Sequence, residues 1–326
     1  MGHHLLHLLK PGLQLTLAQN RLILNDGAVD EHNFPLEDLA AVIAVSFQGT
    51  LSLPLLSALA EHKVPLLVCD ARYRPASFTL PCHQATSTAT LRRQVNLNAT
   101  WKTRVFRLLI QAKLRAQARC LLVLEEDPGF LPALAERLAD EKARAAESRG
   151  ARYYWPRYLA ACETAERRRT PGCGSGANGR LDYGYAVLRA LILRSLYVHG
   201  LIPALGVGHA AKAGSFALAD DLIEPLRPMI DLAQWQFCRQ QAPVEDEAAA
   251  FRAWARAAAA CCVQKVLSKR KVTDLLHGVD RMVQSFCRAM GERLPSSLEL
   301  PEFLPQTAPL LPASSVPKAS RTARRR

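Results

Sequence analysis

Residues 13–27 have the sequence LQLTLAQNRLILNDG. Apolar and polar side chains alternate as far as Leu17, polar residues follow at positions 19–21, and a second apolar run then precedes Asn-Asp-Gly. Successive side chains of a strand point to opposite faces, so the first three leucines of this stretch share one face. Asn20 and the Asn-Asp-Gly sequence are typical of turns. The stretch therefore predicts two strands joined by a turn, and the fold is expected to begin with β structure.

Short apolar runs after this hairpin indicate three more strands. They lie at residues 42–45, 64–69 and 78–80. One helix is expected to interrupt them, with Thr50 or Ser52 as its N-cap and leucines at helical spacing behind it. Residues 1–83 are therefore predicted to form a small β-rich domain.

The period of the apolar residues changes after residues 84–90, a polar stretch that we interpret as a linker. From residue 91 to 292 the apolar side chains recur at helical spacing, interrupted by Gly and Pro only at intervals. Residues 293–326 are rich in Pro and end in three arginines, which is typical of a flexible basic tail. The expected fold class is α+β: a small N-terminal β-rich domain, a larger all-α catalytic domain and a flexible tail.

The charge balance favours a polyanionic partner such as nucleic acid. Lys and Arg number 42 against 29 Asp and Glu, a formal charge of +13. Ten of these bases and no acid lie between residues 71 and 124. A solvated helix face is the plainer interpretation, but such faces usually mix both signs. We therefore expect the first long helix, on which four arginines and Gln111 are spaced to share one face, to hold DNA phosphates through Lys102, Arg104, Arg107, Arg115 and Arg119.

Neither a membrane segment nor a disulfide framework is expected. No run approaches the about 18 apolar residues that a membrane-spanning helix needs, and the apolar patch before Lys10 is too short for a signal peptide. The nine cysteines contain no C-x-x-C pair, which indicates reduced, mostly buried thiols and a cytoplasmic location. Cys261 and Cys262, in an Ala-rich helical run, are interpreted as packed small residues rather than metal ligands.

Three segments carry acids and a histidine in unusual settings. Glu147 lies just before a cluster of aromatic residues, and a Gly- and Pro-rich connection ends in His209. A third segment places Asp220, Asp221 and Glu224 at the start of a helix. Taken singly, these residues have ordinary explanations: a helix carboxylate, a structural histidine, and acids that complement a helix dipole.

As a set, the same residues favour a metal site. Asp221 and Glu224 are three apart on one helix face, and His209 precedes them by a short loop, so one divalent ion could join them. Hard oxygen ligands with one imidazole suit Mg²⁺ or Mn²⁺ rather than a metal that prefers thiolates. Such ions activate a hydroxyl nucleophile and neutralise the charge that develops during phosphoryl transfer.

Four strings in the helical region carry a family resemblance, in this order: ESRGARYYWP from Glu147, DYGYAVL from Asp182, GLIPALGVGH ending at His209, and DLIEPLRP from Asp221. With FPLEDL at residues 34–39 and AEHKVPLLVCD at residues 60–70, they make the chain resemble the CRISPR-associated integrase family from about residue 10 to 290. The order and spacing of the later strings are the specific part of the match.

The resemblance implies a function and a set of site residues. Members of the family insert short DNA fragments, the spacers, into the CRISPR repeat array by metal-dependent transesterification, and they also act as metal-dependent endonucleases. Glu147, His209 and Glu224 align with the catalytic metal ligands, which implies Mg²⁺ or Mn²⁺ as cofactor. Asp221 aligns with an accompanying acid that is a possible accessory ligand, whereas Asp220 has no assigned role.

The resemblance also implies partners. The N-terminal domain would form a homodimer and dock a small adaptation partner protein, with two integrase dimers flanking one partner dimer on double-stranded DNA. The spacing from His209 to Glu224 resembles the type II subtype, which occurs beside a single-protein RNA-guided effector nuclease. That nuclease would be a further partner.

Two features depart from the family pattern and two alternative functions stay open. Asp182 stands where Asn is common, and residues 167–179 do not align. Tyr183 and Tyr185 could pack between helices or contact DNA. A hydrolytic, structure-selective DNase would use the same metal site, whereas a non-catalytic DNA-binding scaffold would use its acids and histidine only structurally.

Overall fold

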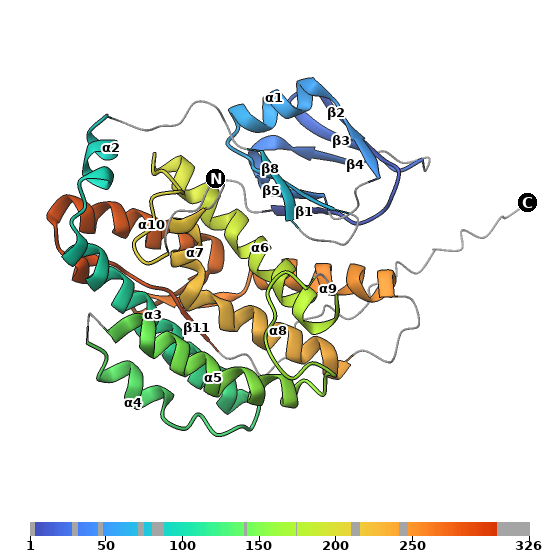
Figure 1. Ribbon diagram of the computed structural model, residues 1–326. Coiled ribbons are helices and arrows are strands. Elements are labelled where there is room, and N and C mark those ends of the chain that lie inside the picture. The colour runs from blue at the N-terminus through green and yellow to red at the C-terminus, as the bar shows by residue number, and fades with distance from the viewer. Residues whose placement is uncertain are drawn as a thin grey trace, which may run out of the picture.

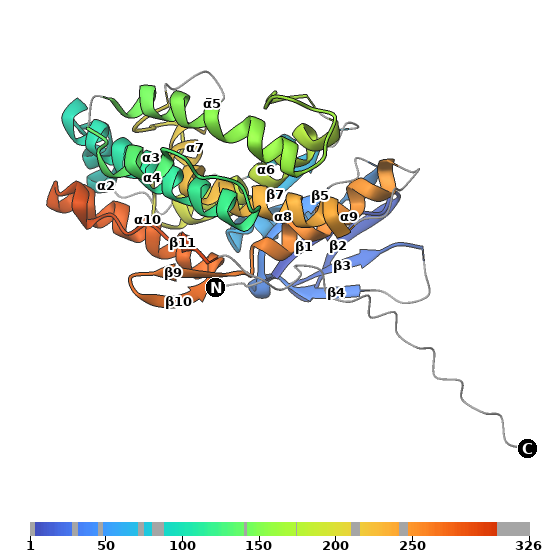
Figure 2. The same cartoon turned by 90° about the horizontal axis from the view of Figure 1, so that it is seen from below.

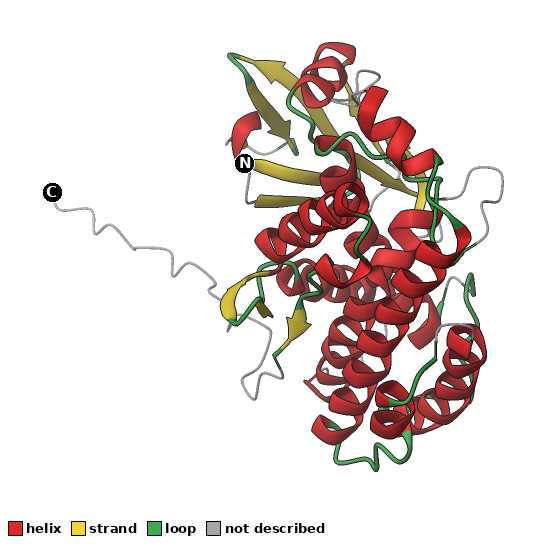
Figure 3. Cartoon of the chain, turned by 90° about the vertical axis from the view of Figure 1, so that its left-hand side faces the viewer, coloured by secondary structure: helices red, strands yellow, loops and turns green. Residues whose placement is uncertain are grey.

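The computed structural model describes residues 4–27, 32–44, 48–70, 75–79, 88–139, 142–173, 175–209, 216–240 and 247–304. The strands of the N-terminal region gather at one end of the molecule, and the helices form a layered bundle beside them (Figures 1 and 3). This arrangement confirms the predicted α+β class. None of the helices in the described part is long and apolar enough to span a membrane.

Two four-stranded sheets make up the N-terminal region. The first has the order β1(His4–Leu8), β5(Leu39–Ala44), β7(Leu66–Cys69), β8(Pro75–Thr79), with β1, β5 and β7 parallel and β8 antiparallel to β7. The second has the order β4(His32–Pro35), β3(Arg21–Asn25), β2(Leu13–Ala18), β6(Gly49–Leu51). Three of these strands, β1, β4 and β6, were not predicted from the sequence because they are short and lack a clear period.

The hairpin predicted at residues 13–27 forms as expected. β2 and β3 pair antiparallel with Leu15 opposite Leu24, and the two turn residues, Gln19 and Asn20, both have positive φ, as a tight hairpin turn requires. The inward leucines of this sheet form one core with α1(Leu53–Glu61). Of the two candidate caps of that helix, Ser52 is the N-cap, since its side chain accepts from the backbone N–H of Leu55.

The first sheet is shared by both regions of the chain. Every residue of β5 but the last is buried, because Val42 packs into the N-terminal core while Ile43, on the opposite face, packs into the helical core. A strand covered on both faces is a continuous apolar run, as LAAVIA is. The two predicted domains are therefore joined along this sheet, and its β7 leads to Asp70 at the wall of the cavity described below.

The helical region is built around α3. Its helices are α2(Thr88–Val95), α3(Ala99–Val123), α4(Leu131–Glu136), α5(Ala143–Ala161), α6(Gly176–Val198), α7(Ala217–Ile223), α8(Arg227–Gln240), α9(Glu247–Cys261) and α10(Leu275–Glu292), with 3-10 turns at Leu36–Asp38, Glu224–Leu226 and Pro295–Ser297. α3 lies between α5 and α10 in two perpendicular views (Figures 1 and 2). The predicted linker overlaps α2 at residues 88–90, and residues 84–87 lie outside the described part.

A small sheet adds to the helical region in a way the sequence analysis did not predict. β9(Lys265–Ser268) pairs with β10(Lys271–Asp274) and with β11(Glu302–Phe303). The hairpin turn consists of Lys269 and Arg270, both at positive φ, and so lacks the Gly or Asn that usually signals such a turn.

The predicted start of the flexible tail at residue 293 is wrong for residues 293–304. This segment forms the 3-10 turn and then β11, where Phe303 lies opposite Val266. The pairing of β11 with β9 and the burial of Leu298 and Pro301 hold this segment in place, which the Pro-rich composition did not reveal. Residues 305–326 of the predicted tail lie outside the described part.

Candidate active site

Glu147 and Glu224 converge on one ammonium group. Lys113, in the middle of α3, places its Nζ 2.7 Å from Oε1 of Glu147 on α5 and 2.6 Å from Oε2 of Glu224, which follows α7. The Lys113 and Glu224 side chains are largely buried, whereas Glu147 keeps partial exposure. Two of the three predicted metal ligands therefore lie together, on either side of a buried cation.

Close packing of α5 on α3 brings Glu147 within reach of Lys113. A Cβ at Gly150, one turn after Glu147, would overlap the side chain of Leu114 on α3. Ala143 and Ala146 on the same helix are also buried. Small residues let two helix backbones approach each other, so this stretch of α5 sets the position of the carboxylate.

The charges around Glu224 stabilise one another. Burial alone would raise the pKa of Glu224, but Arg227, 3.1 Å away, and Lys113 outweigh it and lower the pKa below its usual value. Burial would likewise lower the pKa of Lys113, but Glu224 and Glu147 raise it. Both carboxylate and ammonium are therefore held in their charged forms.

Asp221 organises the loop that carries His209. Its Oδ2 accepts from the backbone N–H groups of Val207 at 2.6 Å and Gly208 at 2.9 Å, and its Oδ1 accepts from that of His209 at 2.9 Å. The same Oδ1 lies 2.7 Å from Nδ1 of His209. Asp221 is fully buried. Both of its oxygens are thus committed to the loop, and the imidazole keeps Nε2 for another partner.

Tight packing fixes this loop further. A Cβ at Gly208 would overlap the ring of Phe106 on α3, and one at Gly206 would lie 2.8 Å from Oδ2 of Asp221. Arg144 on α5 donates to the carbonyl of Gly208 and lies over the Phe106 ring. The glycines of the loop are therefore needed where it approaches α3 and the Asp221 carboxylate.

His209 interacts with both glutamates through their charges. The hydrogen bond with Asp221 is the main cause that raises the pKa of His209, and Asp221, Glu224 and Glu147 add to it through their charges. In the described residues, however, no three side chains of His, Cys, Asp or Glu form a ready-made metal cluster. The three predicted ligands belong to one region, in which Lys113 separates the two carboxylates.

Asp220 has a different role from its neighbours. Its Oδ1 lies 2.6 Å from Nη2 of Arg189 on α6, and both side chains are partly exposed. The pair ties α7 to α6. The three acids of this segment thus serve three purposes: Asp220 binds a neighbouring helix, Asp221 holds the His209 loop, and Glu224 pairs with two cations, Lys113 and Arg227.

A cavity of about 730 Å³ opens beside the paired carboxylates. Lys113, Glu147 and Arg227 line it together with Asp182, Tyr185 and Arg189. Arg169, Pro171 and Gly172, from the segment that did not align, line one side of the cavity. Arg169 pairs with Asp182 and lies over the rings of Trp155 and Tyr185. The cavity wall therefore carries both signs of charge: the cations are Lys113, Arg169, Arg189 and Arg227, and the carboxylates are Asp70, Glu147, Asp182 and Asp231.

The family of the chain follows from a comparison with known proteins. The family model described as CRISPR associated protein Cas1 matches residues 6–249. The chain belongs to the Cas1 family. This confirms the resemblance drawn from the sequence.

Individual relatives of the Cas1 family agree with this assignment. The CRISPR-associated endonuclease Cas1 of Neisseria meningitidis serogroup C (strain 8013) is 30% identical over 304 residues, which cover 91% of this chain and 96% of that protein. Among solved structures, a casposase bound to an integration product has a TM-score of 0.76 at 20% identity, covering 89% and 91% of the two chains. A chain of a Cas6-RT-Cas1–Cas2 complex also reaches 0.76 at 19% identity, covering 93% of this chain and 36% of that one. At such identities the structural matches show the fold alone.

The predicted basic face of α3 is not continuous in this Cas1 chain. Gln111, in the middle of that face, is buried and donates to the carbonyl of Ala135 in α4, so α4 covers the face there. Arg107 donates to Gln111, and Arg119 lies 2.6 Å from Glu302. Lys102, Arg104 and Arg115 lie at separate positions along the helix, and DNA binding by these five bases stays a prediction.

The two tyrosines of the Asp182 string are buried. Tyr183 hydrogen-bonds through its hydroxyl to Nδ1 of His7 on β1 at 3.2 Å, and Tyr185 donates to Asp231. Tyr183 therefore packs between the helices and the first sheet of the Cas1 fold. Asp182, where the family usually has Asn, accepts from Arg169 and from the backbone N–H of Gly172, so it anchors the segment that did not align.

The cysteines of the Cas1 chain fit the sequence expectation. The eight within the described residues are free, and five of them are buried. Burial raises the pKa of Cys261 to about 12, and it raises that of Cys262 as well. Both thiols are therefore packed, unreactive side chains.

Sequence reasoning missed three residues of the site. Lys113 was counted only among the bases of its segment, and nothing in the local pattern separates it from the exposed ones. Arg227 had a usable signal, since it lies three residues after Glu224, the spacing at which helical side chains meet. Arg144, one turn before Glu147, had no such signal because its partner is a loop carbonyl 64 residues away.

Proposed function

We propose that this Cas1-family chain is a CRISPR adaptation integrase that joins short DNA fragments to the repeat array with the help of a divalent cation. One observation carries the proposal: two glutamates from different helices converge on a buried cation beside an imidazole that a buried aspartate orients. The endonuclease name of the Neisseria relative and the integration product bound to the casposase support a reaction at DNA phosphodiesters.

The donor set suits Mg²⁺ or Mn²⁺. Glu147 and Glu224 offer hard carboxylate oxygens, and His209 offers Nε2 because its other nitrogen bonds Asp221. A carboxylate that orients the far side of an imidazole is the usual companion of a metal-binding histidine. We assign Glu147, His209 and Glu224 as the ligands, and we assign Asp221 to positioning rather than to the accessory metal contact first considered.

When bound, such an ion would polarise the attacked phosphate and favour the ionised form of a DNA 3′-hydroxyl. The chain's own residues bind the phosphate and stabilise its charge. Lys113 and Arg227 supply positive charge beside the carboxylates, and Arg189 extends this charge along the cavity wall. These cations hold a scissile phosphate and stabilise its added negative charge as the bond exchanges. Transesterification replaces one phosphodiester with another, so no nucleotide cofactor is needed.

Product analysis tests this function. Supercoiled plasmid, a labelled short duplex and Mn²⁺ are incubated with the protein, with and without the partner protein, and the label is followed. We expect covalent transfer of the label to the plasmid. Cut ends without joined strands would instead establish the hydrolytic DNase, and DNA binding with no change of any strand would establish the scaffold.

The substitution Lys113→Met tests the proposed metal site apart from catalysis. It leaves two carboxylates close together without their shared counter-ion, so the metal-free protein should lose about 3 kcal/mol of stability. A divalent cation bound by those carboxylates would offset the loss. The rise in thermal midpoint on adding Mn²⁺ should therefore be larger in this variant than in the parent, as measured by differential scanning fluorimetry.

The matched control is Lys102→Met, which removes a half-exposed base from the same helix. Its response to Mn²⁺ should equal that of the parent. An equal response in the Lys113 variant as well would mean that the ion binds elsewhere.

We further propose the assembly that the family implies. In the Cas6-RT-Cas1–Cas2 structure the similar chain is accompanied by Cas2, and we propose a small partner of that kind for this chain. Two homodimers flanking one partner dimer on double-stranded DNA, the type II subtype, an association with the effector nuclease and a cytoplasmic location are parts of the same proposal.

A further inference from the structure

A second cavity lies where the ends of α5 and α8 meet the start of α6, and it shares no lining residue with the cavity of the candidate active site. Its volume is about 410 Å³. Two cysteines line it, Cys162 directly after α5 and Cys238 on α8. The side chain of Arg180, on α6, lies beside them. We call it the cysteine cavity.

The two thiols of this cavity contact each other. Cys162 donates a hydrogen bond to Sγ of Cys238. Their helices also meet before the cysteines, since the hydroxyls of Tyr154 and Tyr158 donate to Oδ2 and to the backbone carbonyl of Asp231, at 2.7 and 2.9 Å. Cys162 lies about two turns after Tyr154, and Cys238 lies about two turns after Asp231. The two helices therefore run in the same direction and bring the thiols together at their ends.

The surroundings of Cys238 favour its thiolate. Nη2 of Arg180 donates to Sγ of Cys238 at 3.8 Å, and Nε of the same guanidinium is buried without a hydrogen-bond partner among the described residues. The hydrogen bond from Cys162 is the main cause that lowers the pKa of Cys238, and the charge of Arg180 lowers it further. Burial and the charge of Glu166 act in the opposite direction but are outweighed. Cys238 is therefore the thiol of the pair that loses its proton.

The two thiols differ in exposure. Cys238 is partly exposed, whereas Cys162 is buried. Cys120, Cys261 and Cys262 are also buried, and burial raises the pKa of each. A small oxidant that enters the cysteine cavity therefore meets a thiolate at Cys238, with a second thiol in contact with it.

We propose that Cys238 is a site of oxidation by a hydroperoxide and that the product is a disulfide with Cys162, which fastens the end of α5 to the end of α8. In a reducing compartment both thiols stay free, so the bond forms only when the oxidant is present. α5 carries Glu147, and α8 begins at Arg227. The disulfide thus links the two helices that position these side chains of the candidate active site.

The reaction with hydrogen peroxide has two steps. The Cys238 thiolate attacks one peroxide oxygen and the O–O bond breaks, which leaves sulfenic acid at Cys238 and a hydroxide that takes up a proton to become water. Sγ of Cys162 then attacks the oxidised sulfur, and the hydroxyl leaves with the proton of Cys162 as a second water. Two thiols together lose two electrons, and one peroxide is reduced. The hydrogen bond that raises the pKa of Cys162 is lost once Cys238 is no longer a thiolate, so the second thiol is released to react.

Peptide mapping tests the proposal. The reduced protein is treated with hydrogen peroxide, the remaining thiols are alkylated, and tryptic peptides are analysed by mass spectrometry. Arg167 and Arg180 are among the cleavage sites between the two cysteines, so a disulfide leaves two peptides joined. We expect Cys162 joined to Cys238 before any other pair forms. A bond from Cys238 to the exposed Cys173, or sulfinic acid at Cys238 without a disulfide, would overturn the proposal.

The thermal midpoint supplies a second test. The disulfide closes a long loop, so the oxidised parent should melt about 5 °C above the reduced parent in differential scanning fluorimetry. Each variant is compared with its own reduced form, which separates the effect of oxidation from that of the substitution. Cys162→Ala should show no rise. A rise equal to the parental one in this variant would show that a different bond forms.

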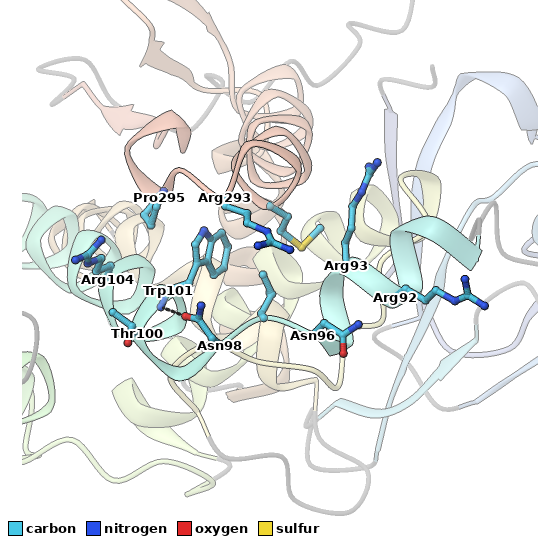
Figure 4. Close-up of a pocket in the computed structure, with 11 residues that line it drawn as sticks. Arg92, Arg93, Asn96, Asn98, Thr100, Trp101, Arg104, Arg293 and Pro295 are labelled. Carbon is cyan, nitrogen blue, oxygen red and sulfur yellow. Dashed lines mark hydrogen bonds between the residues drawn. The ribbon is translucent and has the colours of Figure 1, made fainter.

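The matched control is Cys287→Ala, which removes another partly exposed cysteine. Cys287 lies on α10, whose last turn borders a separate pocket lined by Arg92, Arg93, Arg104 and Arg293 (Figure 4). The structure places no thiol among the residues that line that pocket. The control protein should keep the full rise in thermal midpoint on oxidation, and loss of the rise would contradict the assignment to Cys162 and Cys238.

The substitution Arg180→Met tests the activation of Cys238. Alkylation of Cys238 by iodoacetamide at pH 7 should slow about 3-fold, because loss of the cation raises the pKa of the thiol. Arg180→Lys keeps the charge and should react at nearly the parental rate, and alkylation of Cys173 in the same samples should not change. An unchanged rate at Cys238 in the methionine variant would refute the part assigned to Arg180. None of these measurements needs DNA or a metal ion, so their outcome is independent of the proposed function.

Discussion

The Glu147→Gln protein is expected to bind duplex DNA like the parent but to lose strand joining by about 10³-fold, equivalent to ~4 kcal/mol of transition-state stabilisation. Glutamine keeps an oxygen that can accept from Lys113, so α3 and α5 should stay together. The neutral amide is nevertheless a poor ligand for a divalent cation. Joining is measured as transfer of a labelled duplex to plasmid with Mn²⁺, and binding as anisotropy without it.

Glu136→Gln provides the matched control, because it makes the same chemical change at an exposed position at the end of α4. This variant should join DNA at the parental rate. Joining by the Glu147 variant within a few-fold of the parent would show that this carboxylate is not a ligand, whatever its position beside Lys113.

Asp221→Asn should weaken Mn²⁺ binding about 10- to 100-fold, although we do not assign Asp221 as a ligand. Asparagine has one oxygen where aspartate has two, so its amide N–H₂ must face donors of the His209 loop: either Val207 and Gly208, or His209 itself. A buried donor without an acceptor costs about 2 kcal/mol, and the imidazole loses its orientation. Calorimetric Mn²⁺ titration measures the affinity, and thermal denaturation measures the stability.

The neighbouring acid supplies the control for this experiment. Asp220→Asn breaks a partly exposed pair with Arg189, which should cost at most about 1 kcal/mol and leave Mn²⁺ binding unchanged. If the two variants bound Mn²⁺ equally well, the orienting role assigned to Asp221 would be refuted.

The sequence predicted those parts of the fold that depend on local periods. The β2–β3 hairpin, α1 with its serine cap, and the change from strands to helices all follow from patterns within a few residues. It did not predict β1, whose five residues become a strand only because β5 lies beside them, or the hairpin at Lys269 and Arg270, whose turn lacks glycine. Such elements depend on tertiary packing rather than on propensity.

The candidate site divides in a similar way. Residue chemistry alone grouped His209 with Asp221 and Glu224 as a site for a hard cation, and the family resemblance added Glu147. The contact of both glutamates with Lys113 could not be predicted, because Lys113 is separated from Glu224 by 111 residues and resembles the other bases of α3 in sequence. The interruption of the predicted basic face could not be predicted for the same reason: the spacing of its arginines is right, but α4 covers Gln111 at its middle.

We expect Glu147, His209 and Glu224 to share one divalent cation. Anomalous diffraction from crystals of the protein grown with Mn²⁺ tests it most directly. We expect a single strong peak per chain within about 2.3 Å of a carboxylate oxygen of each glutamate and of Nε2 of His209. A peak bound by other residues, or ordered Glu147 and Glu224 still paired with Lys113 at saturating Mn²⁺, would contradict it.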